Sequence, residues 1–479
     1  MRLSWTVVSI ISRAGSLVIG IALSAYVISF LSVYEQGVRG IVIGIVAMLG
    51  VMQNLGLSSG STKEIASAHT LKEAGKVFLG ALGIRYILSI PIALILILGS
   101  NRFADFYKVG EIVKPLQIFG IVLLVQAMQA TLKSLIQGLH KFSFLFTHQV
   151  LLEALPSLIF HIYFLNAYGF IGFFYGQLAS VLFSTITLGI YSVFVMKGEF
   201  EIPTKDEFMS IFRSIFKIAI IVYVIKIIIT QWEQFGSLVI GKIGTPEDVA
   251  VFTVALFIAL KVVTISDAVT DVSLPRMSSV YKKSRDKFSS IFLAGNSKAF
   301  VMVLFGAVSL ILLKRELIIL IDFVFAFMGK DPLLERYQSS FRLVDFLVIA
   351  FWFYSHLNLF KSGFSIPIGK PMQALVVFLE LMLVTIVSLF MLKTFLDLNL
   401  AIVISMAVGG LVSYLHYLWM IKKEIGLVPV QLADLNYLII SVVLVVLSYS
   451  FQFFNVFIFA VFSLISLYFM KIAFNRNEN

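Results

Sequence analysis

The chain has 479 residues and a formal net charge of +11; 59% of its residues are hydrophobic and only 13% are charged. Soluble globular proteins have roughly 45–50% apolar and 25% charged residues, so this composition excludes an ordinary soluble protein. The chain has no cysteine, which excludes disulfides and thiolate metal sites. Its Lys and Arg residues are spread over many short segments between apolar runs, which argues against a nucleic-acid-binding surface.

Long runs without Asp, Glu, Lys or Arg cover much of the chain. A membrane-spanning helix needs about 20 predominantly apolar residues, and the runs Ala154–Met196 and Leu435–Met470 are long enough for two helices each. The sequence therefore predicts an all-α polytopic membrane protein with about 14 transmembrane helices. The expected helices span residues 7–32, 37–59, 77–99, 114–139, 145–166, 169–195, 212–241, 249–274, 289–312, 339–361, 372–393, 400–421, 435–452 and 455–472.

Basic residues predict which side of the membrane each connection occupies, because cytoplasmic loops carry an excess of Lys and Arg. The connections at 166–169 and 450–456 contain no basic residue, and the connection at 314–342 mixes both charges. The connections on the other side contain many: Lys63, Lys72, Lys76, Lys141, Lys197, Lys205, Arg213, Arg276, Lys282, Lys283, Arg285, Lys287, Lys361, Lys370, Lys422, Lys423, Lys471 and Arg476. We therefore expect a multi-pass protein of the cytoplasmic (inner) membrane, with both termini in the cytoplasm.

The most polar connection follows the sixth expected helix and suggests a division of the chain into halves. We expect an N-terminal lobe at 1–196 (helices 1–6), a cytoplasmic linker at 197–211 and a C-terminal lobe at 212–424 (helices 7–12). Residues 425–479 would add helices 13 and 14 and a cytoplasmic tail. Six helices on each side of a linker are typical of a two-lobed transporter with a central cavity.

Residues 212–242 are long and apolar enough to span a membrane, yet they contain Lys226 and Glu233. Lys226, Thr230 and Glu233 are spaced i, i+4 and i+7, so they share one face of a helix. An ionisable side chain at the middle of a bilayer costs about 2.5–3.5 kcal/mol. We therefore expect this face to contact protein or a water-filled cavity.

Polar residues recur at helical spacing on other expected helices, and such stripes are typical of surfaces that face the interior of a helix bundle. The stripes are Gln126, Gln129, Lys133 and Gln137; Gln149, Glu153, Ser157 and His161; Ser9, Arg13, Ser16, Gly20 and Ser24; and Lys261, Thr264, Asp267 and Asp271. The candidate substrate-binding cations are Arg13, Arg39, Arg85, Lys133, Lys226 and Lys261. A cavity lined by these cations predicts an anionic cargo such as a phosphate or a carboxylate.

The acidic residues in these helices have two interpretations. The candidates for ion coupling or charge pairing are Glu153, Glu233, Asp267 and Asp271. They would either neutralise neighbouring cations or carry coupling protons or sodium ions. The stripes also have a structural alternative, because polar side chains join transmembrane helices through hydrogen bonds. The long side chains of Arg39 and Lys133 can in addition extend to the membrane interface.

Signals for an enzyme are weak. The six histidines are scattered, without an HExxH pair that would bind zinc. Residues 363–370 resemble a phosphate loop, but their spacing is wrong and Pro371 stands where a hydroxyl is required. The connections are too short to hold a catalytic domain. We therefore expect no enzymatic activity, no metal, and no cofactor other than a coupling ion.

Several short motifs carry a resemblance to a known family. They are Ala25–Gly37, Met52–Gly60, Lys63–Ala66, Gln137–Phe142, Gln231–Phe235, Gly241–Gly244, Val249–Ala255 and Leu274–Ser278. In these segments the chain resembles the polysaccharide and oligosaccharide flippases of the multidrug/oligosaccharidyl-lipid/polysaccharide exporter superfamily. The count of about 14 helices fits the flippases of this superfamily better than its drug exporters, which usually have fewer.

The resemblance implies an inverted-V bundle of two lobes that works by alternating access, with helices 13 and 14 packed outside. Its substrate would be a polyprenyl-linked oligosaccharide, flipped from the cytoplasmic to the outer leaflet for cell-surface polysaccharide or glycan biosynthesis. The cavity cations would hold its phosphate or diphosphate while the lipid tail stays in the bilayer. Membrane lipids and glycan-assembly enzymes would be its partners. The alternative within the superfamily is a proton- or sodium-coupled multidrug exporter, and a membrane-embedded glycosyltransferase is a third class.

Overall fold

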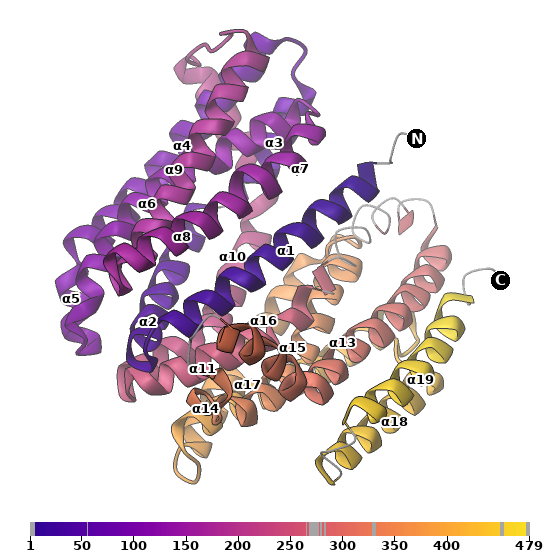
Figure 1. The fold of residues 1–479 in the computed structure, drawn as a ribbon. Helices are drawn as coiled ribbons and strands as arrows, with labels where there is room; N and C mark the ends of the chain where they lie inside the picture. The colour runs from indigo at the N-terminus through magenta and orange to yellow at the C-terminus, as the bar shows by residue number, and fades with distance from the viewer. Residues whose placement is uncertain are drawn as a thin grey trace. The chain divides into compact units, whose positions relative to one another are not determined.

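The computed structural model describes residues 5–54, 56–264, 266–267, 277, 280–281, 284–327, 332–450 and 455–475. All regular secondary structure in this described part is helical (Figure 1). The prediction of an all-α protein is therefore confirmed. The chain divides into two compact units, Met1–Ala250 and Val251–Asn479.

The first unit consists of helices joined by short connections. Within it, α6 packs against both α4 and α9, and α10 packs against α2, α3 and α4. The elements are α1 (Trp5–Phe30), α2 (Val33–Gly50), η1 (Val51–Gln53), α3 (Leu57–Ser67), α4 (Leu71–Leu98), α5 (Ser100–Tyr107), η2 (Gly110–Ile112), α6 (Val113–Gly138), α7 (Phe142–His148), η3 (Gln149–Ala154), α8 (Leu155–Tyr168), α9 (Phe170–Met196), α10 (Lys205–Ile243) and α11 (Pro246–Ala259), which crosses the boundary between the units.

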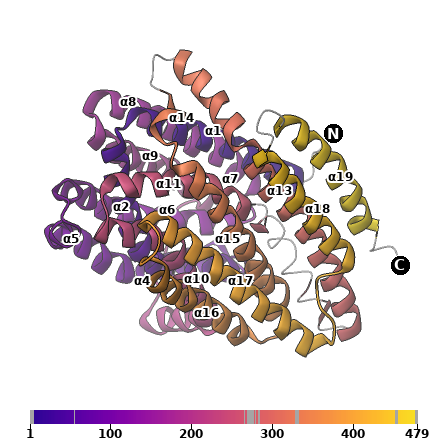
Figure 2. The same ribbon diagram turned by 90° about the horizontal axis from the view of Figure 1, so that it is seen from below.

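The second unit is built around α15, which packs against α13, α16 and α17. The last two helices, α18 and α19, lie side by side and pack against α13 (Figure 2). The described elements are α13 (Arg285–Phe327), α14 (Leu333–Arg336), α15 (Ser340–Phe360), η4 (Lys361–Ser365), α16 (Pro371–Leu392), α17 (Leu398–Ile425), α18 (Leu432–Ser450) and α19 (Asn455–Asn475).

Among the described residues, ten helical segments are long and apolar enough to cross a membrane by length and composition. They are Val33–Ser67, Leu71–Leu98, Gly110–Gly138, Phe142–Tyr168, Phe170–Met196, Ser340–Ser365, Pro371–Leu392, Leu398–Ile425, Leu432–Ser450 and Asn455–Ala473. The remaining expected spans overlap α1, α10, α11 and α13, and residues 265 and 268–274 of the expected span 249–274 lie outside the described residues. Each expected span therefore overlaps a described helix, and the protein is a multi-pass membrane protein.

The start of α10 differs from the sequence-based expectation. The side chain of Thr204 accepts a hydrogen bond from the backbone N–H of Glu207, and the Glu207 carboxylate accepts one from the backbone N–H of Thr204. This capping box satisfies N–H groups that have no partner at a helix start. The helix therefore begins at Lys205 and includes polar residues that were expected in the linker.

The connection between α8 and α9 is a tight turn at the expected place. Gly169 has φ +60°, a conformation that favours glycine. Three residues later, a Cβ on Gly172 would lie only 1.9 Å from the carbonyl oxygen of Phe164. The absence of a side chain at Gly172 therefore lets the backbones of the two helices approach closely, as is typical of membrane helix pairs.

A buried apolar cluster of the first unit lies where α3, α4, α6, α9 and α10 meet. Its buried side chains are Leu57, Ile65, Ala74, Val77, Phe78, Ala81, Ile84, Leu132, Leu135, Ile136, Leu188, Met196 and Ile211. Because lipid is as apolar as these side chains, close packing and interhelical hydrogen bonds hold such helices together. The polar side chains inside the unit are therefore part of what fixes its helices.

Candidate functional site

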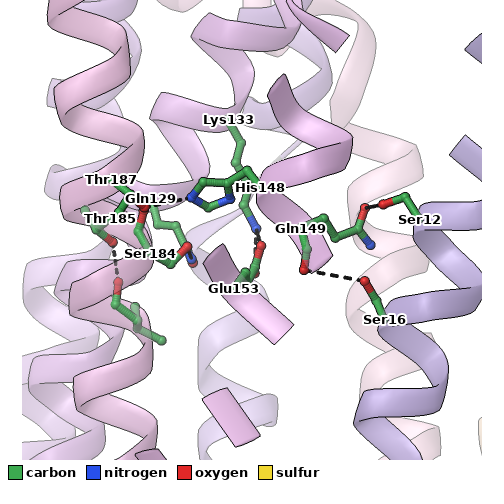
Figure 3. A network of polar contacts seen from close by, with 11 residues as sticks. Ser12, Ser16, Gln129, Lys133, His148, Gln149, Glu153, Ser184, Thr185 and Thr187 are labelled. Atoms are coloured by element: carbon green, nitrogen blue, oxygen red, sulfur yellow. Dashed lines mark hydrogen bonds and ion pairs between the residues drawn. The ribbon is translucent and has the colours of Figure 1, made fainter. Parts of the chain in front are cut away.

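The central feature of the first unit is an ion pair between α6 and η3. Nζ of Lys133 lies 2.7 Å from Oε1 and 2.7 Å from Oε2 of Glu153. Figure 3 shows the two side chains directed at each other from neighbouring helices. The side chain of Lys133 is 36% exposed and that of Glu153 is 33% exposed. The pair is thus a direct contact between two partly exposed side chains.

Glu153 belongs to a π-helical turn, η3, between α7 and α8. The backbone N–H of Leu155 bonds the carbonyl of Val150, five residues back. Pro156 follows at the start of α8. It has no backbone N–H, so it cannot donate the usual α-helical hydrogen bond to the carbonyl four residues earlier. Turns of this kind are rare and occur frequently at functional sites.

Near the ion pair, neutral polar side chains bond α6 and α7 to α9. Gln129, one turn before Lys133 on α6, donates a hydrogen bond of 2.6 Å to the Ser184 hydroxyl. Nε2 of His148 lies 2.9 Å from Oγ1 of Thr187 (Figure 3). Gln129, His148 and Ser184 are buried. These bonds satisfy polar groups that would otherwise be costly in a membrane interior.

The first helix joins the same network on the other side of η3. Ser12 donates to the backbone carbonyl of Phe146 at 2.9 Å, and its hydroxyl lies 3.4 Å from Oε1 of Gln149. The hydroxyl oxygen of Ser16 lies 3.5 Å from the backbone carbonyl oxygen of Gln149 (Figure 3). The network therefore runs from α1 across η3 and α6 to α9. We call it the α6–η3 network: Ser12, Ser16, Gln129, Lys133, His148, Gln149, Glu153, Ser184 and Thr187.

Arg85 is a second cation inside the first unit, on α4. The residue is only 2% exposed. Its guanidinium donates to Ser58 Oγ at 3.0 Å and to Asn54 Oδ1 at 3.4 Å, and no acidic side chain of the described residues pairs with it. Ser134 donates to the Ser58 carbonyl at 3.3 Å. Arg85 thus lies in a polar contact between α3, α4 and α6, held by neutral oxygens.

Arg39 and the α10 residues occupy other parts of the first unit. Arg39 donates to Gln36 at 3.3 Å, and its Cζ lies 4.4 Å from the centre of the Phe173 ring. On α10, Lys226 is exposed, whereas Thr230 is buried and Glu233 is half-buried. The three residues therefore differ in surroundings although they share a helix face.

The polar stripe of the eighth expected helix, which includes Lys261 and Asp267, belongs to the second unit. Nζ of Lys261 lies 4.1 Å from the centre of the Phe257 ring. Asp267 accepts a hydrogen bond of 2.8 Å from Asn358, which in turn accepts one of 2.6 Å from Lys361. Lys361 opens η4, a second π-helical turn. The side chain of Arg13 and the whole of Asp271 lie outside the described residues.

Of the described candidates, Lys133 and Glu153 form an ion pair, and Asp267 accepts a hydrogen bond from Asn358. The stripes on the fourth and fifth expected helices therefore do meet. Ser12, His148, Ser184 and Thr187 were not singled out from the sequence. Ser184 and Thr187 are three residues apart on α9, a spacing that offered a signal. The described residues contain no group of three or more His, Asp or Glu side chains that could hold a metal ion.

The α6–η3 network places an ammonium beside a carboxylate at a partly exposed position. An ammonium held by a carboxylate presents hydrogen-bond donors to any oxyanion that replaces the carboxylate. Because Lys133 is already partly exposed, a phosphate reaching it would not require a buried lysine to be uncovered.

Comparisons with solved structures identify proteins of similar fold. The chain is similar to the solved structure of the lipid II flippase MurJ in an inward closed conformation, with a TM-score of 0.70, 14% identity and 98% of each chain covered. It is similar to an inward-facing multidrug resistance MATE family transporter of the MOP superfamily, with a TM-score of 0.68 and 15% identity over 85% of this chain and 94% of the other. A MOP superfamily transporter from Pyrococcus furiosus matches with a TM-score of 0.55 and 14% identity, over 87% and 94% of the two chains.

These likenesses establish the fold. No curated protein matches the chain in sequence. The family model described as "Polysaccharide biosynthesis protein" matches residues 28–322, which is more than half of the chain. This match confirms the family that the sequence motifs resemble. The chain belongs to the polysaccharide biosynthesis protein family and has the fold of the MOP-superfamily transporters.

Proposed function

We propose that the protein flips a polyprenyl-(di)phosphate-linked oligosaccharide from the cytoplasmic to the outer leaflet of the inner membrane by alternating access. The lobes would be 1–196 and 212–424, joined by the linker 197–211, with both termini in the cytoplasm. Glycan-assembly enzymes would supply the substrate and consume the product. Such a route is needed because carrying sugar hydroxyls and a phosphate through hydrocarbon without hydrogen-bond partners is prohibitively unfavourable.

The observation that carries the proposal is the partly exposed Lys133–Glu153 pair within a membrane unit of this family. A flippase for a phosphate-bearing lipid needs a cation that stays charged in the membrane without trapping its ligand. Glu153 meets both needs, because it neutralises Lys133 when the site is empty and can be displaced by phosphate. In this proposal Lys133 binds the substrate phosphate and Glu153 is the coupling acid, taking up a proton when phosphate displaces it.

Translocation in reconstituted vesicles tests this function. A fluorescent polyprenyl-diphosphate sugar should move between leaflets in vesicles that contain the protein and should remain in place in empty vesicles. Folded, reconstituted protein that leaves every such lipid in its leaflet would contradict the proposal. Export of a fluorescent lipophilic cation that stops in Glu153→Gln and Glu233→Gln would instead support the multidrug-exporter alternative.

Lys226→Ala is expected to lower transport more than it lowers the yield of folded protein. Lys226 is exposed, so its removal should change stability by no more than about 0.5 kcal/mol. Loss of a cation that attracts the substrate phosphate should reduce flux about fivefold, corresponding to about 1 kcal/mol. Flux normalised to reconstituted protein is the measurement, with Lys205→Ala at the start of the same helix as the control. Unchanged flux in Lys226→Ala would assign Lys226 a structural or interfacial role.

A further inference from the structure

A groove on the first unit lies apart from the α6–η3 network. It has a volume of about 980 Å³ and is lined by Met48 of α2 and by residues of α4, α5 and α10. We call it the α5 groove. Cavities of about 300–1,000 Å³ are large enough to bind small ligands. The groove therefore has room for a ligand, and its lining indicates which kind.

The walls of the α5 groove are almost entirely apolar. Leu94 and Leu98 of α4 line one side and are 47% and 76% exposed, and Leu238 and Val239 of α10 also contribute. Such exposed aliphatic side chains on membrane helices are suited to contact with acyl chains. An apolar wall alone, however, is common to all lipid-facing surfaces.

The charged residues distinguish this groove from the rest of the apolar surface. Arg102 of α5 and Lys242 of α10 are the charged side chains among its lining residues, and both are positive. Tyr107 is the remaining ionisable group of the lining; burial raises its pKa to about 12, so it is a neutral phenol at neutral pH. The groove thus combines an apolar wall with two cations and has no acidic residue among its lining residues.

The two cations differ in their contacts, and both retain free donors. Lys242 donates to the backbone carbonyl of Phe106 at 2.6 Å and lies 3.9 Å from the centre of the Phe106 ring, which fixes its ammonium against α5. An ammonium has three N–H groups, so it can still donate to a ligand. Arg102 is exposed and forms no ion pair within the described part of the chain. Its guanidinium can bind two oxygens of one phosphate.

The location of α5 agrees with a headgroup site. This helix connects α4 to η2 and α6, outside the segments that cross the membrane. It carries Phe103, Phe106 and Tyr107, and aromatic side chains are enriched at the level of lipid headgroups. The apolar wall of α4 therefore extends from this level towards the membrane interior.

We propose that the α5 groove binds one anionic phospholipid of the surrounding membrane. Its phosphate would be bound by Arg102 and Lys242, and its acyl chains would lie along Leu94, Leu98 and Leu238. The proposal does not depend on the transported substrate, because none of these residues belongs to the α6–η3 network. A lipid in this position would contact α4, α5 and α10 together.

Native mass spectrometry of the full-length protein in detergent tests the proposal. The probes are phosphatidylglycerol and phosphatidylcholine with identical acyl chains, together with water-soluble glycerophosphoglycerol. We expect phosphatidylglycerol to bind at least about fivefold more tightly than phosphatidylcholine, and Arg102→Gln to remove most of this difference. Lys114→Gln, which removes an exposed lysine at the start of α6 outside the groove, is the matched control and should bind like the unaltered protein.

A second variant examines the apolar wall. Leu94→Trp places a larger side chain in the groove at a position that is half exposed, so the fold should tolerate it. It should weaken phosphatidylglycerol binding while Arg102 and Lys242 remain. Equal affinities for the two lipids, or unchanged binding in both Arg102→Gln and Leu94→Trp, would overturn the proposal. Binding of glycerophosphoglycerol as tight as that of the lipid would also overturn it, since the site would then recognise a free phosphate ester.

Discussion

Replacing Lys133 by glutamine is expected to lower transport of a polyprenyl-diphosphate sugar about 10- to 100-fold. A hydrogen bond to a charged group contributes about 1.5–3 kcal/mol, and each 1.4 kcal/mol is a factor of ten. The variant removes the ammonium that Glu153 holds at 2.7 Å. It leaves a carboxylate without its partner on η3, so stability should fall as well. Flux per reconstituted protein and thermal unfolding in detergent should be measured together.

A double variant separates the two effects. Lys133→Glu combined with Glu153→Lys restores an ion pair between the same helices but moves the positive charge to η3. Its unfolding temperature should return towards that of the unaltered protein. Its flux should stay low if the cation that binds the phosphate must be on α6. Lys114→Gln is the control for removal of a lysine from α6. Normal flux in Lys133→Gln, or full recovery of flux in the double variant, would show that the pair has a structural role only.

Gly172→Val is expected to prevent α8 and α9 from packing as they do. A Cβ at this position would lie 1.9 Å from the carbonyl oxygen of Phe164, and this backbone atom cannot move aside as a flexible side chain would. Overpacking typically costs about 1–3 kcal/mol, and occasionally more. A clash with backbone should lie at the upper end of that range. We expect a large loss of monodisperse protein in size-exclusion chromatography and a lower unfolding temperature.

Gly189 provides the matched control, because it lies on the same helix and a Cβ there would meet nothing within 4 Å. Gly189→Ala should leave the yield unchanged or raise stability slightly, since alanine favours helix more than glycine does. A stable, monodisperse Gly172→Val protein would contradict the close approach of α8 to α9.

The positions of the helices were predictable from apolar run length alone, because a bilayer requires about 20 apolar residues per span. The same rule separated α8 from α9, where Gly169 marks the turn inside an uncharged run. The start of α10 was not predictable from hydropathy. Its first residues are polar, and the helix extends over them because Thr204 and Glu207 cap it.

The site was predictable in part for a similar reason. Periodic spacing placed Lys133 and Glu153 on stripes expected to face inwards, but it could not indicate which stripes meet. That choice depends on how α6 and η3 pack, and on buried neutral partners such as His148 and Ser184. Serines and threonines in apolar helices usually bond their own backbone, so the spacing of Ser184 and Thr187 did not by itself indicate a bond to another helix.

The two π-helical turns share a sequence context. The first ends at Ala154, two residues before Pro156, and the second ends at Ser365, two residues before Pro367. Proline does not by itself produce such a turn, since Pro91 lies within α4. Each π-turn holds one residue more than an α-turn, so converting the first to α-geometry would shift the register between its two flanks by one residue. Such a shift corresponds to about 100° of rotation and 1.5 Å of rise. Glu153 would then lose its alignment with Lys133, so a change in one helical turn is sufficient to separate the two charges.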